Sequence, residues 1–224
     1  LGKEVALIEG LHVGGDCTNV GCVPSKTLIH LAKNFKEGTN PDEVLRETIR
    51  KRDALRNLET EEVQEIENLT FIEGMAQFTA PKTLEITNSA GETQQITAEN
   101  IVISTGARPR RLDIPGLPAE RSMTNIELFD LENAPKHIAI IGAGVIALEM
   151  AFALQKIGTK VTMLALDKRA LITSISEAAE AIQASLDHKG IATYYGATAK
   201  SYDEATQTLT LTQGDAEIAV NDVD

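Results

Sequence analysis

The strongest constraint on the fold is a strand, loop, helix and strand pattern in residues 136–165. An apolar strand, His137–Ile141, leads into the glycine loop GAGVIA, a helical segment and a second apolar strand at 160–165. This order is typical of a dinucleotide-binding βαβ unit. Gly142 permits the tight turn, and Gly144 lets a pyrophosphate approach the backbone. The pattern predicts an α/β fold with a nucleotide site here and favours that over an empty scaffold.

The second strand of this unit ends in Ala165-Leu166, where an NAD site would place an acidic residue. Asp167 comes two residues late, whereas Lys168 and Arg169 could contact the 2′-phosphate of NADP. The sequence therefore leaves the choice between NAD and NADP open.

The only two cysteines of the 224 residues lie in the run GGDCTNVGCVPSK. Five residues of α-helix rise about 7.5 Å, more than the ~4.4–6.8 Å between the Cα atoms of a disulfide. A distorted turn is therefore expected from Cys17 to Cys22, with Gly21 supplying backbone freedom. Pro24 suits the first position of the next helix, so Cys22 lies near a helix N-terminus. The dipole and Lys26 would favour a thiolate there.

Two alternatives compete with a redox pair. Two unrelated buried thiols would explain neither the glycines nor the lysine. A zinc site would need four ligands, and no histidine stands at ligand spacing from the cysteines.

The run Asn19–Lys26 resembles the active-site signature of the class I flavoprotein disulfide reductases, which include lipoamide dehydrogenase, mercuric reductase and glutathione reductase. Ser25 fits the first two better than the third. The resemblance covers the whole chain but about half of a family enzyme. It implies that the first FAD glycine loop and the C-terminal dimerisation domain, with its catalytic His and Glu, lie outside these residues. The intact protein is expected to be a homodimer, and these 224 residues alone are expected to be inactive.

The fold implied by the resemblance is α/β, with two Rossmann-like dinucleotide-binding domains and an antiparallel β-meander insertion. Residues 1–125 would form a partial FAD-binding domain that carries the redox disulfide and a helical segment. Residues 126–224 would form the NAD(P)-binding domain without its last strand.

The resemblance also implies the reaction. Hydride would pass from NAD(P)H through FAD to a Cys17–Cys22 disulfide and then to a disulfide or metal-ion substrate. Cys22 would be the charge-transfer thiol and Cys17 the interchange thiol. Lys26 would lie by the flavin, with Glu149 as its ion-pair partner. The implied cofactor-binding residues are Glu9, Gly14, Gly15, Asp16, Lys26, Ala76, Thr105, Gly106, Gly142, Gly144, Val145, Ile146 and Glu149.

Three of these positions carry further information. Glu9 ends a short strand, where an acid bonds the adenosine ribose. Asp16 replaces a threonine that is usual beside the FAD pyrophosphate. Val145 stands where some relatives have a gating tyrosine, so no tyrosine lid is expected.

Other segments are predicted from their periodicity. Lys3–Glu9 reads as a strand buried on both faces. Residues 41–67 form an amphipathic helix capped by Asn40, whose charges are interpreted as a solvated face. Strands at 70–73, 75–79, 83–87 and 94–97 form an antiparallel meander, and 100–104 form a buried strand. Ser176–His188 is a helix, followed by strands at 191–195, 207–212 and 217–220.

Composition excludes some functions. A net charge of −12 argues against nucleic-acid or anionic-membrane partners. No apolar run approaches ~18 residues, and one active cysteine pair fits the reducing cytoplasm. His12, His30 and His137 are interpreted as incidental, and no resident metal is expected. The alternative to an oxidoreductase is a non-catalytic nucleotide-binding module or a thiol redox sensor.

Overall fold

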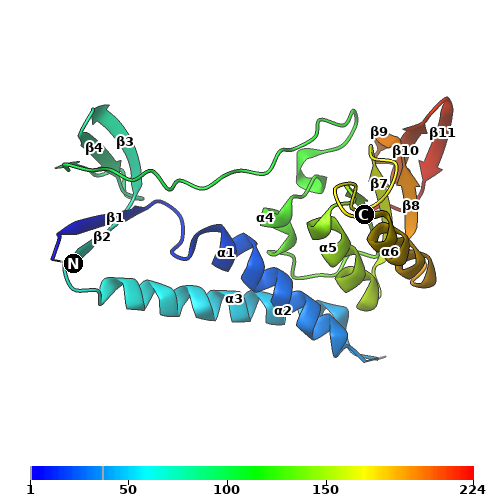
Figure 1. Cartoon of the computed structure of the whole chain (residues 1–224), viewed down its shortest axis with the longest axis horizontal. Coiled ribbons are helices and arrows are strands. Elements are labelled where there is room, and N and C mark those ends of the chain that lie inside the picture. Colours follow the sequence, from blue (N-terminus) through cyan, green and yellow to red (C-terminus); the bar gives the residue numbers. More distant parts are fainter. Residues whose placement is uncertain (1, 37) are drawn as a thin grey trace. The chain divides into compact units, whose positions relative to one another are not determined.

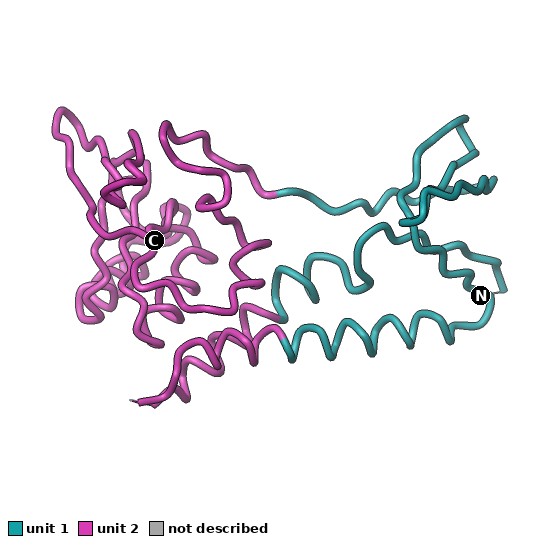
Figure 2. The backbone as a smooth tube through the Cα atoms, turned by 180° about the vertical axis from the view of Figure 1, so that it is seen from behind, with its two compact units in different colours: residues 1–23, 50–108 teal, residues 24–49, 109–224 magenta. Residues whose placement is uncertain are grey.

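The computed structural model describes residues 2–36 and 38–224, which fall into two compact units (Figure 2). Unit 1 comprises residues 1–23 and 50–108, and unit 2 comprises residues 24–49 and 109–224. Helices α2 (Cys22–Lys33) and α3 (Pro41–Gln64), labelled in Figure 1, each contribute residues to both units (Figure 2). Of the described helices, none combines the length and apolarity needed to cross a bilayer.

Unit 1 contains two small sheets. Its other elements are β1 (Val5–Glu9), α1 (Gly15–Val20), β2 (Leu69–Glu73), β3 (Met75–Ala80), β4 (Thr83–Thr87) and β5 (Thr93–Thr97). Strands β3, β4 and β5 form the predicted antiparallel meander. Leu84 and Ile86 alternate with more exposed neighbours along β4 and are buried, as the period of a strand requires.

The assignment of residues 70–73 to the meander is wrong. β2 pairs in parallel with β1, in a register that runs from Val5 opposite Leu69 to Glu9 opposite Glu73. Local alternation identifies a strand but does not identify its partner, which here lies more than sixty residues earlier in the chain.

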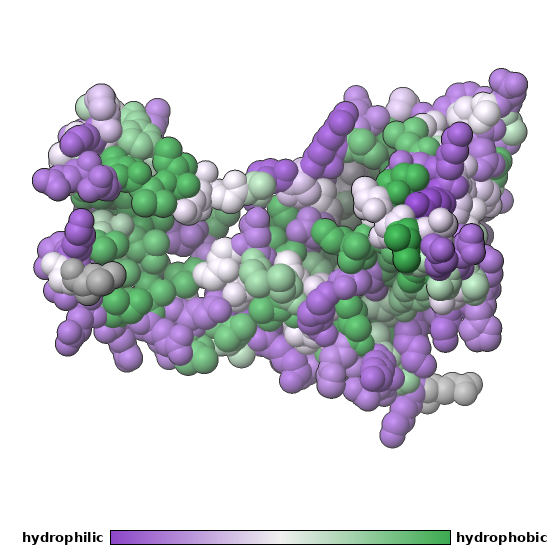
Figure 3. All heavy atoms as spheres, viewed as in Figure 1, coloured by the Kyte–Doolittle hydropathy of each residue, from purple (hydrophilic) through white to green (hydrophobic). Residues whose placement is uncertain are grey.

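Two burial predictions in unit 1 are also wrong. Val5 and Leu7 of β1 are exposed, and residues 100–104 form no strand. Val102 and Ile103 are 86% and 69% exposed. No described strand pairs with this segment, so its backbone makes none of the inter-strand hydrogen bonds that define a strand. Apolar side chains are correspondingly visible on the surface of unit 1 (Figure 3).

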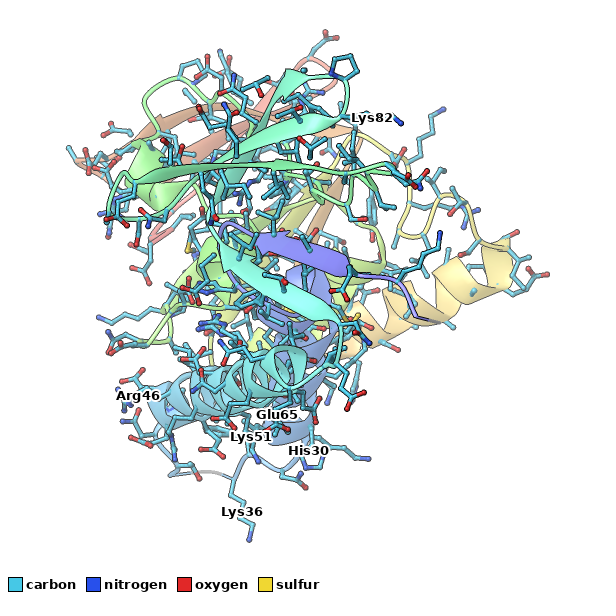
Figure 4. All side chains as sticks on the ribbon, turned by 90° about the vertical axis from the view of Figure 1, so that its left-hand side faces the viewer. His30, Lys36, Arg46, Lys51, Glu65 and Lys82 are labelled. Carbon is cyan, nitrogen blue, oxygen red and sulfur yellow. The ribbon has the colours of Figure 1, made fainter. Side chains whose placement is uncertain are left out.

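Helix α3 begins as predicted. The Asn40 side chain accepts a hydrogen bond from the backbone N–H of Asp42 at 3.1 Å. Arg46 projects outward from the helix and pairs with Glu43, and Lys36 extends away at the far end of α2 (Figure 4). The interpretation of every charge on α3 as solvated is wrong for Arg52, which is 5% exposed and lies 2.9 Å from Asp53.

Unit 2 contains the predicted βαβ unit. Its elements are η1 (Ala119–Arg121), α4 (Asn125–Leu128), β6 (His137–Ile141), α5 (Val145–Lys156), β7 (Lys160–Ala165), α6 (Ser176–His188), β8 (Ala192–Tyr195), β9 (Ala197–Asp203), β10 (Thr208–Gln213) and β11 (Ala216–Val220). Strands β6, β7 and β8 form a parallel sheet. Ala151 and Leu154 of α5 are completely buried in the core against this sheet. The α/β fold class is confirmed.

The last three strands form an antiparallel sheet in the order β11-β10-β9. The sequence predicted β8, β10 and β11 to within one or two residues but missed β9. A single residue, Gly196, separates the end of β8 from the start of β9, and its φ is 66°. Such a short connection hides the boundary between two strands.

His137 is a buried polar link in unit 2. Its Nδ1 donates to the Asn221 carbonyl at 3.0 Å, because a carbonyl only accepts, and Nε2 lies 2.9 Å from the Thr162 hydroxyl. Burial, followed by the charge of Lys160, lowers the pKa of His137. The lowered pKa favours a neutral imidazole for His137 in the folded protein.

We expect His137 to make the fold sensitive to acid. Its contribution is fully present above about pH 6.5, the ordinary pKa of histidine, and is lost as the pH falls, because the unfolded chain then binds more protons. His137→Gln should lower the free energy of unfolding by about 1 kcal/mol at pH 7.5, because a hydrogen bond is lost. Between pH 7.5 and 5.5, however, the variant should lose less stability than the wild type. Thermal unfolding at both pH values tests this. The exposed His188→Gln is the control and should keep the wild-type slope; equal slopes for all three proteins would contradict the assignment.

Candidate functional site

The cysteines lie on either side of a sharp break between two helices. Cys17 is in α1, and Cys22 is the first residue of α2. Gly21 between them has φ −125° and ψ −115°. A Cβ at Gly21 would lie 2.8 Å from the carbonyl oxygen of Asp16, so only glycine lets the chain turn this closely.

Two local predictions need correction here. Cys17 lies in a short helix, and the irregular backbone is confined to Gly21. Pro24 is the third residue of α2. This position is still tolerated, because the first four N–H groups of a helix have no partner within it.

Both cysteines are exposed free thiols that are hydrogen-bonded to each other. This hydrogen bond is the largest of the effects that raise the pKa of Cys17, ahead of desolvation. Cys22 is the first residue of α2. The raised pKa favours the thiol form of Cys17 over its thiolate.

Contacts with α3 fix the cysteine segment. Asn19, buried two residues after Cys17, donates to the carbonyls of Val13 and Gly15 at 2.9 and 2.8 Å. Its oxygen accepts from Arg56 Nε at 2.5 Å. Sequence reasoning missed Arg56 as well as Arg52 and Glu59. Their spacing places them on one face of α3. This row of polar residues in the sequence could have indicated that the face contacts another part of the chain.

The candidate FAD residues of unit 1 are mostly exposed, including Gly14, Gly15, Ala76, Thr105 and Gly106. One carboxylate oxygen of Glu9 accepts from the backbone N–H of Leu11 at 2.7 Å. This bond orients the acid at the end of β1, where it suits a ribose hydroxyl.

Asp16 lies beside Gly106. A Cβ added at Gly106 would be 3.7 Å from both Asp16 carboxylate oxygens. Asp16 adds a negative charge to the glycine-rich turn, which is unfavourable for the pyrophosphate of FAD at this place.

Lys26 and Glu149 are brought together in unit 2. Lys26 Nζ lies 2.5 Å from Glu149 Oε1, and the two side chains are 61% and 31% exposed. Lys26 follows Cys22 by one turn of α2, and Glu149 is on α5. Exposed pairs of this kind contribute only about 0–1 kcal/mol to stability. The fold therefore gains little stability from this pair.

The glycine loop of unit 2 has room for a phosphate. Gly142 has a φ of 127°, and a Cβ on Gly144 would meet nothing within 4 Å. No described side chain caps α5 at its N-terminus, and Val145 and Ile146 are 62% and 70% exposed. Uncapped N–H groups and the helix dipole suit a pyrophosphate, so these residues fit a dinucleotide.

Arg169 has a local role that the sequence did not reveal. Its guanidinium donates to the carbonyls of residues that follow β7, most closely to Ser174 at 2.7 Å and Ile172 at 3.3 Å. Leu171 in the same loop donates its N–H to the Ala143 carbonyl at 3.0 Å. Arg169 therefore braces the loop against the glycine turn, and Lys168 is the more available cation for a 2′-phosphate.

We expect Arg169→Ala to loosen residues 171–175, because the carbonyls lose their shared donor. Hydrogen–deuterium exchange of these amides should accelerate roughly three- to tenfold, the size expected for loss of about one hydrogen bond. Lys168→Ala is the matched control and should leave exchange unchanged. Acceleration in both variants, or in neither, would contradict the bracing role.

Comparison with known proteins identifies the family. A model of the pyridine nucleotide-disulphide oxidoreductases matches residues 1–223. The chain belongs to this family. It is 31% identical to a mercuric reductase of Staphylococcus aureus over 91% of its length, which is 39% of that protein. It is 30% identical to a dihydrolipoyl dehydrogenase of Chlorobaculum parvum over 88% of its length and 45% of that protein.

A solved structure supports the same assignment. The HOCl-induced flavoprotein disulfide reductase RclA of Escherichia coli superposes with a TM-score of 0.85 at 28% identity, covering 99% of this chain and 50% of that one. The chain thus spans half or less of these relatives. The predicted family is confirmed, and the predicted cofactors, FAD with NAD or NADP, are those of the family.

Proposed function

We propose that the intact protein is an FAD-dependent oxidoreductase that passes hydride from NAD(P)H to a Cys17–Cys22 disulfide and then to a disulfide or metal-ion substrate. The observation that carries the proposal is the hydrogen-bonded thiol pair across the Gly21 break, with Cys22 at the start of α2. Family membership supports the proposal.

Each candidate residue has a role in this proposal. Glu9 would hold the adenosine ribose of FAD, and the loop from Gly142 to Ile146 would hold the pyrophosphate of NAD(P)H. When bound, FAD supplies the relay for hydride between nucleotide and cysteines. Gly14, Gly15, Ala76, Thr105 and Gly106 would border the flavin cofactor. The division into domains at residues 1–125 and 126–224 belongs to the same proposal.

The cysteines would act in sequence on a disulfide substrate. The Cys17 thiolate attacks one substrate sulfur, forms a mixed disulfide and releases the other as a thiol. The Cys22 thiolate then attacks the sulfur of Cys17 and releases the second substrate thiol, so the Cys17–Cys22 disulfide is restored. Cys17 must lose its proton first, and its raised pKa makes this step dependent on pH.

The thiols and the relatives support the proposed substrate classes. Mercuric reductases are among the relatives, and RclA has also been solved as a Cu(II) complex. Two adjacent thiols suit a soft metal ion. Within the described residues no group of three or more His, Cys, Asp or Glu could hold a resident metal. We therefore infer that a metal ion would be a substrate at the cysteines. A homodimer and a cytoplasmic location are part of the proposal for the intact protein.

The test is an anaerobic titration of the intact, flavin-loaded protein with one equivalent of NADH and, separately, of NADPH. We expect the flavin absorbance to fall and a long-wavelength thiolate-to-flavin band to appear, because the Cys22 thiolate would contact the flavin. The nucleotide that reduces the flavin faster is the preferred hydride donor. In the Cys22→Ser variant the flavin should be reduced, but the long-wavelength band should not appear. Bleaching of the wild type without a band, or a colourless protein, would favour a nucleotide-binding module or thiol sensor instead.

We expect Glu149→Gln in the intact enzyme to remove the charge that faces Lys26 and so to change the flavin potential and lower turnover. The measurements are a redox titration of the bound flavin and steady-state kinetics. Glu177→Gln on α6 is a control for the general loss of one negative charge. Unchanged potential and turnover in Glu149→Gln would show that the ion pair has no part in catalysis.

A further inference from the structure

A carboxylate of α3 lies directly against the cysteine segment of unit 1. Glu59 Oε1 accepts a hydrogen bond from the hydroxyl of Thr18 at 3.1 Å, and Thr18 is the residue after Cys17. Thr18 is buried, with 4% of its surface exposed. The Glu59 charge is therefore held at a fixed place next to the first cysteine.

The second oxygen of this carboxylate is unusual. Glu59 Oε2 is buried and finds no hydrogen-bond partner among the described residues. A buried oxygen without a partner is costly and needs a reason. A Cβ at Gly14 would lie 2.2 Å from this oxygen and 2.6 Å from Thr18 Oγ1. The glycine at position 14 thus leaves the space that Glu59 occupies.

We propose that Glu59 is a positioning residue that, through its hydrogen bond from Thr18 and its own negative charge, disfavours a thiolate at Cys17. This inference rests on the cysteine chemistry proposed above. It says that a residue of α3, Glu59, controls the reactivity of the Cys17 thiol. The fixed carboxylate repels a thiolate at Cys17. The fold itself thereby disfavours the charged form of the first thiol.

The charged surroundings of Cys17 agree with this assignment. The hydrogen bond with Cys22 and desolvation contribute most to the raised pKa of Cys17, and the charge of Glu59 adds a smaller effect in the same direction. Asp16 on α1 is the adjacent acid in the chain, and Arg56 of α3 is engaged with Asn19. The effect of Glu59 is limited by solvent because Cys17 is exposed, so a small change in reactivity is expected.

The test is the pH profile of iodoacetamide alkylation of Cys17 in the intact, fully reduced protein, read by peptide mass spectrometry. Cys22→Ser serves as the background, so that Cys17 cannot pair with it. Glu59→Gln keeps an acceptor for Thr18 and removes the charge. We expect it to shift the profile to lower pH and to raise the rate at pH 7.5 about two- to fivefold, less at high salt, because the thiolate fraction increases.

Two further variants make the result decisive. Glu62→Gln removes an exposed carboxylate from the same helix and should leave the profile unchanged. Glu59→Asp keeps the charge and should stay within about twofold of the background rate. The proposal is overturned if Glu59→Gln has the background profile, if Glu62→Gln shifts it equally, or if Glu59→Asp shifts it as much as Glu59→Gln. Because alkylation needs neither NAD(P)H nor turnover, each of these results is independent of the anaerobic titration.

Discussion

The side chain of Asn19 makes three hydrogen bonds, and the geometry of the cysteine pair depends on them. Two go to carbonyls around the start of α1, and one joins α1 to Arg56 on α3. A helix of six residues is too short to be stable alone. The place of Cys17 is therefore set by a helix whose contact residue lies 37 positions later. The reactive segment is a local motif held by distant contacts.

This division between local and distant information explains what the sequence could predict. The strands and helix of residues 137–165 and the helix Ser176–His188 were predicted closely, because periodicity and glycine punctuation are local signals. The partner of β2 and the exposure of Val102 were not, because both depend on which strands meet in space. Arg52 looked like one more charge on a polar helix, and only packing shows that it is buried.

The candidate site divides in the same way. Motif spacing selected Cys17 and Cys22, and the resemblance to the family implied a Lys26–Glu149 ion pair, which the structure contains. Glu59 and Arg169 carry no motif, since each acts through backbone or hydroxyl partners whose positions depend on the fold. Residues that touch cofactor or substrate are constrained by chemistry and leave a pattern in sequence. Residues that hold them in place are constrained by geometry alone.

The extended segment around Val102 and Ile103 has a consequence for handling this chain. Its apolar side chains are exposed, and no described strand satisfies its backbone groups. An extended apolar segment with unpaired backbone groups is a template for pairing between molecules. Concentrated solutions of these residues alone should therefore self-associate through this segment, so that recovery of the isolated chain is limited by aggregation before its redox chemistry can be measured.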